Sequence, residues 1–268
     1  MLPCLSHPSP YIDVHLSEQI LHIQIHRPEV KNALSADMYS FLADIFIEAD
    51  QSSEINVIIL QGNHSDFTAG NDMKDFMAAA HSFHDLAPGD TPPFRFLKAL
   101  ARCSKPVIAA LRGCTIGVGV TLLFHCDLVY AHPQTEFQIP FVSLGLSVEG
   151  GTSLLMSEMA GYHMAAELLL TGRKFSADEA LTARIINQIT EQPEQLALEK
   201  AQQMAQMPLS SLKIIKRQIR KPLDQVIQCI DDEAEVVATR LKSPEMLEAV
   251  MAFLQKRQPD FSPFNAAS

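Results

Sequence analysis

Near the amino terminus, apolar residues alternate with polar ones in two short runs. The runs are YIDVHLS (Tyr11–Ser17) and ILHIQIH (Ile20–His26), and they are separated by two residues. This pattern predicts a β-hairpin. A stripe of apolar residues at helical spacing comes next and predicts a helix with Ser35 as its N-cap: Met38, Phe41, Leu42, Ile45, Phe46 and Ala49.

Further along, short apolar runs alternate with helical segments up to about residue 185. The runs INVIILQG, PVIAAL, DLVYAH and EFQIP predict strands, and helices are expected from about Gly119 and from Gly151. Strands separated by helices indicate an α/β architecture with parallel pairing. Beyond Ile185 the pattern is nearly continuous helix divided by prolines, with Ser243 as an N-cap. We therefore expect a core over residues 1–190 and a helical oligomerisation region over residues 191–268.

Composition and charge narrow the class of partner. The 268-residue chain is 47% hydrophobic and has a formal net charge of −10. We expect no membrane partner, because no apolar run approaches the roughly 18 residues of a membrane helix. We also expect no nucleic acid, because phosphates require a basic surface. The five cysteines are scattered without a CxxC pair, and the first residues lack the features of a signal peptide, so a cytoplasmic location is predicted.

Metal and nucleophile motifs are weak. His81 and His84 are three residues apart, but they precede a loop without further ligands, so no metal is expected. Ser153 has no paired histidine and aspartate motif, which argues against a catalytic triad.

Two glycine-rich stretches each follow a predicted strand and open a predicted helix. They are FTAGNDMKDF and the stretch containing Gly113, Gly117 and Gly119. Amides at the start of a helix have no intrahelical acceptor, so they can stabilise an oxyanion or enolate. The second stretch, GVGVTL, lacks the third glycine of a dinucleotide-binding motif, which argues against dinucleotide binding.

Glu149 is a lone carboxylate in LGLSVEGGTSLL, with no basic residue within ten positions on either side. Such a residue is either a solvated turn residue or an acid/base group whose pKa is raised by desolvation. The surrounding residues alone leave both alternatives open.

Four segments, in this order and spacing, resemble the crotonase (enoyl-CoA hydratase/isomerase) superfamily. They are RPEVKNALSADM, FTAGNDMKDF, KPVIAALRGCTIGVGVTLLFHCDLVYA and FVSLGLSVEGGTSL, and the ending FLQKRQPDF is similar too. The resemblance implies an α/β fold with a ββα spiral core and a C-terminal helical trimerisation region. It also implies a homotrimer or hexamer, an acyl-CoA substrate and no cofactor, since coenzyme A is part of the substrate.

The resemblance also implies roles for particular residues. The backbone N–H groups of Asn71 and Val118 correspond to the oxyanion hole. Phe76, Met77 and Phe141 correspond to the acyl pocket. The positions implied to bind coenzyme A are Lys31, Ala33, Leu34, Ala69, Asp72 and Lys256, of which Lys256 is expected to approach the nucleotide from a neighbouring subunit.

The reaction is predicted from the carboxylates. Family hydratases carry two glutamates, at the positions of Thr121 and Phe141 here, so simple hydration is not expected. Peroxisomal-type Δ3,Δ2-enoyl-CoA isomerases carry one glutamate before two glycines, and SVEGG is similar, with Glu149 as the single base. The alternatives left open are a hydratase, a dienoyl-CoA isomerase, a ring isomerase, an acyl-CoA hydrolase, and an acyl-CoA-binding or RNA-binding member without catalysis.

Overall fold

The chain begins with the predicted hairpin. The computed structural model describes residues 2, 4, 9–72 and 86–265. Strands β1 (Ile12–Ser17) and β2 (Ile20–Ile25) pair antiparallel, with Ser17 opposite Ile20. The turn residues Glu18 and Gln19 both have positive φ, the conformation of a two-residue hairpin turn that follows the twist of its strands. The hairpin prediction is confirmed.

The main sheet is six-stranded, in the order β1-β2-β3-β4-β6-β9. Its remaining strands are β3 (Val57–Gln61), β4 (Val107–Leu111), β6 (Leu128–Ala131) and β9 (Gln188–Ile189). All neighbours from β2 onward are parallel. Parallel strands covered on both faces have nearly continuous apolar sequences, which explains runs such as VIAAL. The predicted α/β architecture is confirmed.

A second, three-stranded sheet lies beside the first. It consists of β5 (Cys114–Ile116), β7 (Glu136–Gln138) and β8 (Lys174–Ser176). Strands of three residues are too short for a reliable alternation pattern, so the sequence predicted β7 but neither β5 nor β8.

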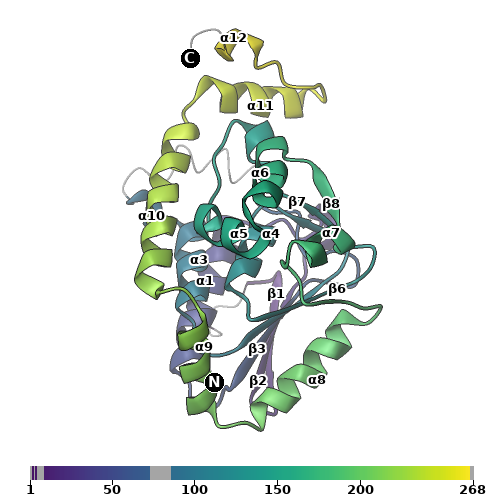
Figure 1. The fold of residues 1–268 in the computed structure, drawn as a ribbon, viewed down its shortest axis with the longest axis vertical. Helices are drawn as coiled ribbons and strands as arrows, with labels where there is room; N and C mark the ends of the chain where they lie inside the picture. The colour runs from purple at the N-terminus through teal and green to yellow at the C-terminus, as the bar shows by residue number, and fades with distance from the viewer. Residues whose placement is uncertain (1, 3, 5–8, 73–85, 266–268) are drawn as a thin grey trace.

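Helices cover both faces of the main sheet (Figure 1). On one face lies α1 (Ala36–Gln51), whose N-terminal amide at Met38 donates to the Ser35 hydroxyl as predicted. Helix α3 (Pro92–Arg102) packs on α1, with the rings of Phe46 and Phe96 6.0 Å apart. On the other face, α8 (Pro193–Ala205) buries Ala197 and Ala201 against β3 and β4. Helix α8 therefore packs on the sheet although it follows residue 190, and the division of the chain there stays a prediction.

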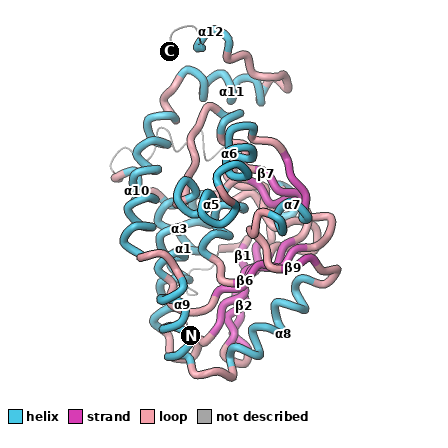
Figure 2. Tube along the Cα trace, in the orientation of Figure 1, coloured by secondary structure: helices cyan, strands magenta, loops and turns pink. Residues whose placement is uncertain are grey.

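Most of the remaining helices come after β5 in the chain, and α9 to α12 form its carboxyl-terminal part (Figure 2). The helix expected from Gly119 is a single turn, α4 (Val118–Thr121), continued by the 3₁₀ helix η4 (Leu122–His125). Helix α11 (Pro244–Leu254) begins at the predicted cap Ser243, and lies with α12 (Ser262–Asn265) at one end of the molecule (Figure 1). The other elements are η2 (Pro28–Val30), η3 (Pro88–Asp90), η5 (Val142–Leu144), α5 (Thr152–Ala160), α6 (Tyr162–Thr171), α7 (Ala177–Thr182), α9 (Leu209–Ile219) and α10 (Leu223–Arg240).

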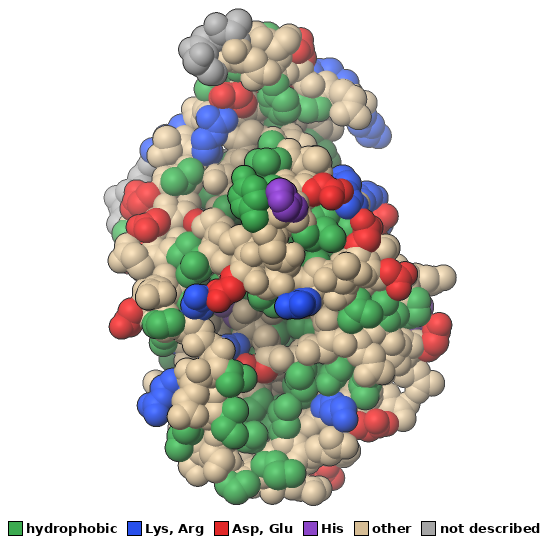
Figure 3. Space-filling model, in the orientation of Figure 1, with side chains coloured by type: hydrophobic (Ala, Val, Ile, Leu, Met, Phe, Trp, Pro, Cys, Tyr) green, Lys and Arg blue, Asp and Glu red, His purple; other side chains and the backbone are tan. Residues whose placement is uncertain are grey.

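The visible face of the molecule carries charges of both signs (Figure 3), and the cysteines form no disulfide bonds. On the face seen in Figure 3, acidic and basic side chains are interspersed. All five cysteines are free thiols. Within the described ranges, no helix combines the length and the apolar composition that crossing a bilayer requires.

Candidate functional site

The two glycine-rich turns touch each other. Gly70 has a φ of 89°, and a Cβ added to it would lie 2.8 Å from the carbonyl oxygen of Ile116. A Cβ on Gly119 would lie 2.7 Å from the Thr68 methyl carbon. Real side chains do not fit at such distances, so glycine at both positions lets the two turns approach closely.

Each turn presents a main-chain N–H group without an internal acceptor. Leu34 donates to the Gly70 carbonyl at 2.8 Å and accepts from the Asp72 amide at 2.9 Å. This parallel bridge leaves the N–H of Asn71 pointing away from Leu34. Val118 is the first residue of α4, so its N–H has no acceptor within the helix. Across the described residues, neither N–H donates to a protein acceptor.

Glu149 is a buried carboxyl group. Only 4% of its surface is exposed, and its Oε1 atom has no hydrogen-bond partner among the described residues. Burial and, to a smaller extent, the nearby charge of Glu233 raise the pKa of Glu149 to about 7, and a hydrogen bond with the Thr121 hydroxyl opposes the shift. Of the two alternatives for this residue, the solvated turn residue is wrong. A carboxyl group with a pKa near neutrality can both accept and return a proton.

Thr121 and Tyr39 both interact with Glu149, and each also lies close to a residue that carries one of the two N–H groups. Thr121 contacts Glu149 and lies at the end of the single helical turn that begins at Val118. The Tyr39 hydroxyl donates to the side-chain oxygen of Asn71. Desolvation and the charge of Glu149 both raise the pKa of Tyr39 well above its ordinary value, which places Tyr39 near the carboxylate. Sequence reasoning did not single out Tyr39; the only signal is a hydroxyl inside a helix stripe that is otherwise apolar.

Most residues predicted to bind coenzyme A lie on two adjoining loops. The Ala69 amide donates to the Lys31 carbonyl at 2.9 Å, which joins these loops beside the Leu34 bridge. Arg27 joins them again, since its guanidinium donates to the Ala33 carbonyl at 3.0 Å and to Asp72 at 2.8 Å. The structure thus brings together Lys31, Ala33, Leu34, Ala69 and Asp72, and adds Arg27, which the sequence pattern did not indicate.

Lys256 lies apart from that group. It is exposed and follows α11 at one end of the molecule. In the described part of the chain, no hydrogen bond or ion pair joins its side chain to those loops. Its proposed approach from a neighbouring subunit stays a prediction.

Phe141 lies beside the second turn. It is 6% exposed, and its ring comes within 4.0 Å of a Cβ added to Gly117, the residue before Val118. Phe141 and Thr121, at the positions of the hydratase glutamates, therefore both flank the site without a group that titrates near neutral pH. The other predicted acyl-pocket residues, Phe76 and Met77, lie outside the described residues, as do His81 and His84.

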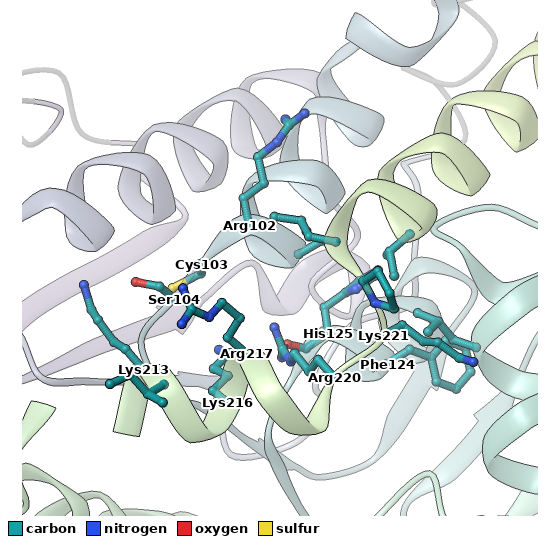
Figure 4. A pocket seen from close by; sticks show the side chains of 16 residues that line it. Arg102, Cys103, Ser104, Phe124, His125, Lys213, Lys216, Arg217, Arg220 and Lys221 are labelled. Atoms are coloured by element: carbon teal, nitrogen blue, oxygen red, sulfur yellow. The ribbon is translucent and has the colours of Figure 1, made fainter. Parts of the chain in front are cut away.

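A basic pocket of about 410 Å³ is lined by residues of α3, η4 and α9, with six lysine and arginine side chains among the lining residues (Figure 4). Asp127 pairs with two of its cations, at 2.7 Å from Lys216 and 3.1 Å from Arg220. His125 lies on the wall of this pocket, and its ring contacts the Gly150 carbonyl at 2.8 Å. In the described ranges, this pocket included, no three histidine, cysteine, aspartate or glutamate side chains are grouped so that they could hold a metal ion.

Residues 15–263 match the family described as Enoyl-CoA hydratase/isomerase. The chain belongs to this family. Among solved structures, this family member is similar to an enoyl-CoA hydratase/isomerase from Acinetobacter baumannii, with a TM-score of 0.89, 49% identity and coverage of 92% of this chain and 99% of that one. The crotonase fold predicted from the motifs is confirmed.

Relatives of known name include both isomerases and hydratases. The chain is 29% identical over 244 residues to enoyl-CoA delta isomerase 2 of Rattus norvegicus, covering 89% of this chain and 62% of that protein. It is 28% identical over 256 residues to 2,3-dehydroadipyl-CoA hydratase of Escherichia coli (strain K12), covering 92% and 97%. The chain thus spans about three fifths of the length of the rat relative. Such similar identities do not separate isomerisation from hydration, so the choice depends on the residues of the site.

Proposed function

We propose that this protein is a Δ3,Δ2-enoyl-CoA isomerase, which moves the double bond of a 3-enoyl-CoA into conjugation and so admits unsaturated acyl chains to β-oxidation. The observation that carries the proposal is Glu149, a buried carboxyl group whose Oε1 atom has no hydrogen-bond partner among the described residues and whose pKa is raised by burial to about 7. Thr121 contacts Glu149 and belongs to the same helical turn as Val118, while Tyr39 holds the side chain of Asn71. Across the described residues, the N–H groups of Asn71 and Val118 donate to no protein acceptor.

The chemistry needs one base and one oxyanion site. The thioester oxygen would accept hydrogen bonds from the N–H groups of Asn71 and Val118. Glu149 would take a proton from C2 of the acyl chain, and the electrons would delocalise over C2–C4 and the thioester as a dienolate. The same carboxyl group would then return the proton to C4, which leaves the double bond between C2 and C3. Loss of one such N–H donor typically costs about 2.7–4 kcal/mol of transition-state stabilisation.

The residues beside Glu149 weigh against hydration. Adding water to a double bond requires a group that activates the water and a group that protonates the carbon. Thr121 and Phe141 offer no second carboxyl group beside Glu149. The charge of the Glu233 carboxylate acts on Glu149, but its two oxygens accept hydrogen bonds from the amides of Gly151 and Ser153.

We further propose that the loops carrying Lys31 and Asp72 hold the coenzyme A portion of the substrate, so that no separate cofactor takes part. We propose a homotrimer, or a hexamer of two trimers, in a cytoplasmic setting. Support for assembly comes from large apolar side chains on α11 that are exposed in the single chain: Leu247 at 61%, Phe253 at 60% and Leu254 at 59%.

A spectrophotometric assay tests the reaction. The purified protein is mixed with a 3-enoyl-CoA, and the ultraviolet absorbance of the conjugated 2-enoyl thioester is followed. A parallel assay follows the loss of that absorbance when a 2-enoyl-CoA is hydrated. We expect rapid isomerisation and little hydration. Hydration as fast as isomerisation, or no turnover with either substrate, would contradict the proposal.

A further inference from the structure

The peptide groups around Glu149 are held by buried polar side chains from distant parts of the chain. The Gly150 carbonyl contacts the His125 ring nitrogen Nε2 at 2.8 Å, and the Gly151 amide donates to Glu233 Oε2 at 2.6 Å. Within the turn itself, the Glu149 carbonyl accepts from the Thr152 hydroxyl at 2.5 Å. The main chain on the carboxyl side of the proposed base is therefore anchored at consecutive residues.

This anchoring is needed because the turn has an unusual backbone. Gly150 and Gly151 have φ values of 73° and 76°, so two successive residues adopt a left-handed conformation that glycine tolerates readily. Two successive glycines also have more freedom to move than other residues. The external hydrogen bonds therefore determine the direction in which the Glu149 side chain leaves the turn.

Glu233 supplies most of the anchoring from α10. Besides the Gly151 amide, its other oxygen accepts from the amide of Ser153 at 2.8 Å and from the hydroxyl of Ser153 at 2.6 Å. These groups are at the start of α5, where Gly151 offers no capping side chain of its own. Glu233 is 7% exposed, so its charge acts on Glu149 through a poorly screened environment.

His125, in η4, holds the same turn through the Gly150 carbonyl. It is 3% exposed, and burial lowers its pKa to about 4, so the ring is neutral at neutral pH. Because a carbonyl oxygen only accepts, Nε2 is the protonated nitrogen that donates to Gly150. Arg220 in turn donates to the His125 carbonyl from the basic pocket (Figure 4).

We infer that Glu233 is a positioning residue for the proposed base, which fixes the direction of Glu149 by holding the amides of Gly151 and Ser153 at the start of α5. His125 holds the other side of the same turn. The inference rests on the proposed function insofar as Glu149 is the base, but the geometry of the turn is independent of it.

Two substitutions separate the roles of charge and reach. Glu233→Gln keeps the length of the side chain but removes its charge and one of its two acceptor oxygens, whereas Glu233→Asp keeps the charge and both oxygens and withdraws them from the α5 amides. Glu235→Gln is the matched control, since Glu235 lies on the same helix and is exposed. The proton affinity of Glu149 is read directly from a carboxyl ¹³C NMR titration of glutamate-labelled protein, with its signal assigned by loss in Glu149→Gln.

We expect the Glu149 titration midpoint to fall in Glu233→Gln and to stay at the wild-type value in Glu235→Gln. We expect Glu233→Asp to retain a raised midpoint but to lose roughly ten- to a hundredfold in kcat at pH 8.5 with little change in KM, because misplacing a base by about 1 Å is costly. If Glu233→Gln does not fold, Glu233→Asp still tests the positioning role by its split between kcat and KM.

An unchanged midpoint in Glu233→Gln, together with unchanged kcat in Glu233→Asp, would overturn the inference. Failure of the proposed function looks different. In that case wild-type protein would not isomerise a 3-enoyl-CoA, while the NMR midpoint would still respond to Glu233→Gln.

Discussion

The proton affinity of Glu149 is set by its surroundings. Its pKa rises from 4.5 to about 7, chiefly because burial disfavours the charged form. In the unfolded chain the same carboxyl group ionises near pH 4.5. Between these two values the folded state binds more protons than the unfolded state, so Glu149 lowers the free energy of unfolding as the pH rises through this window.

We predict that Glu149→Gln increases the free energy of unfolding more at pH 8 than at pH 4. Glutamine keeps the shape but cannot ionise, so the variant avoids a penalty of roughly 3 kcal/mol, at about 1.4 kcal/mol for each pKa unit. Urea unfolding of both proteins at the two pH values measures the difference. A gain of the same size at pH 4 and pH 8 would mean that the pKa of Glu149 is not raised.

Tyr39 offers a second test at the scale of one residue. Its hydroxyl holds the side chain of Asn71, whose backbone N–H is one of the two proposed donors. We predict that Tyr39→Phe lowers kcat for isomerisation roughly tenfold and leaves KM within about twofold, because the donor is less well oriented in the transition state. Tyr162→Phe, at a site that is 72% exposed, is the control. Equal kinetics in both variants would show that Tyr39 does not orient the Asn71 donor.

At the scale of elements, the site depends on the contact between the two glycine turns. Gly119 in α4 lies against Thr68, so any side chain at position 119 pushes the two turns apart. The proposed donors Asn71 and Val118 are carried by these turns. The contact thus determines the separation of the two N–H groups.

We predict that Gly119→Ala costs about 1–3 kcal/mol of stability by overpacking and lowers kcat. The added Cβ would lie 2.7 Å from the Thr68 methyl carbon, and Thr68→Ser removes that methyl group while keeping its hydroxyl, which donates to the Asn32 carbonyl at 2.7 Å. The double variant should therefore recover part of both losses. Chemical denaturation and kinetics of the two single variants and the double variant measure this, and no recovery in the double variant would contradict the steric explanation.

The sequence predicted elements better than the contacts between them. Alternation and helical spacing were sufficient for the hairpin and for α1, since these patterns report local geometry and burial. A helix does begin near Gly119 as predicted, but η4 tightens the chain after one α-helical turn, which no periodicity indicates. Glu233 and His125 contact the turn of Glu149 from positions 82 and 25 residues away from their partners. Such long-range hydrogen bonds follow from the fold and leave no local pattern.

At the scale of the whole molecule, α11 carries an apolar surface that one chain does not bury. Leu247, Phe253 and Leu254 are all about 60% exposed, near the predicted coenzyme A residue Lys256 in the sequence. Contiguous exposed apolar side chains commonly mark contacts between proteins. Assembly through α11 would also bring Lys256 close to a neighbouring subunit, as its predicted contact with coenzyme A requires.

We predict that Phe253→Glu converts the proposed trimer to smaller species, because a buried, unpaired charge destabilises an interface. Sedimentation equilibrium measures the mass of the variant against wild type. Leu181→Glu, at an exposed position on α7, is the control. A Phe253→Glu protein with the same mass as wild type would exclude this part of α11 from the interface.

The role of Glu149 as the single base is measured by comparing wild type with Glu149→Gln in the conversion of a 3-enoyl-CoA to its 2-enoyl isomer. We expect turnover in wild type to rise with pH to a plateau above about pH 7, and we expect the variant to lose turnover while its binding of acyl-CoA stays nearly intact. Turnover at the wild-type rate in Glu149→Gln would contradict the account, because the base would then lie elsewhere.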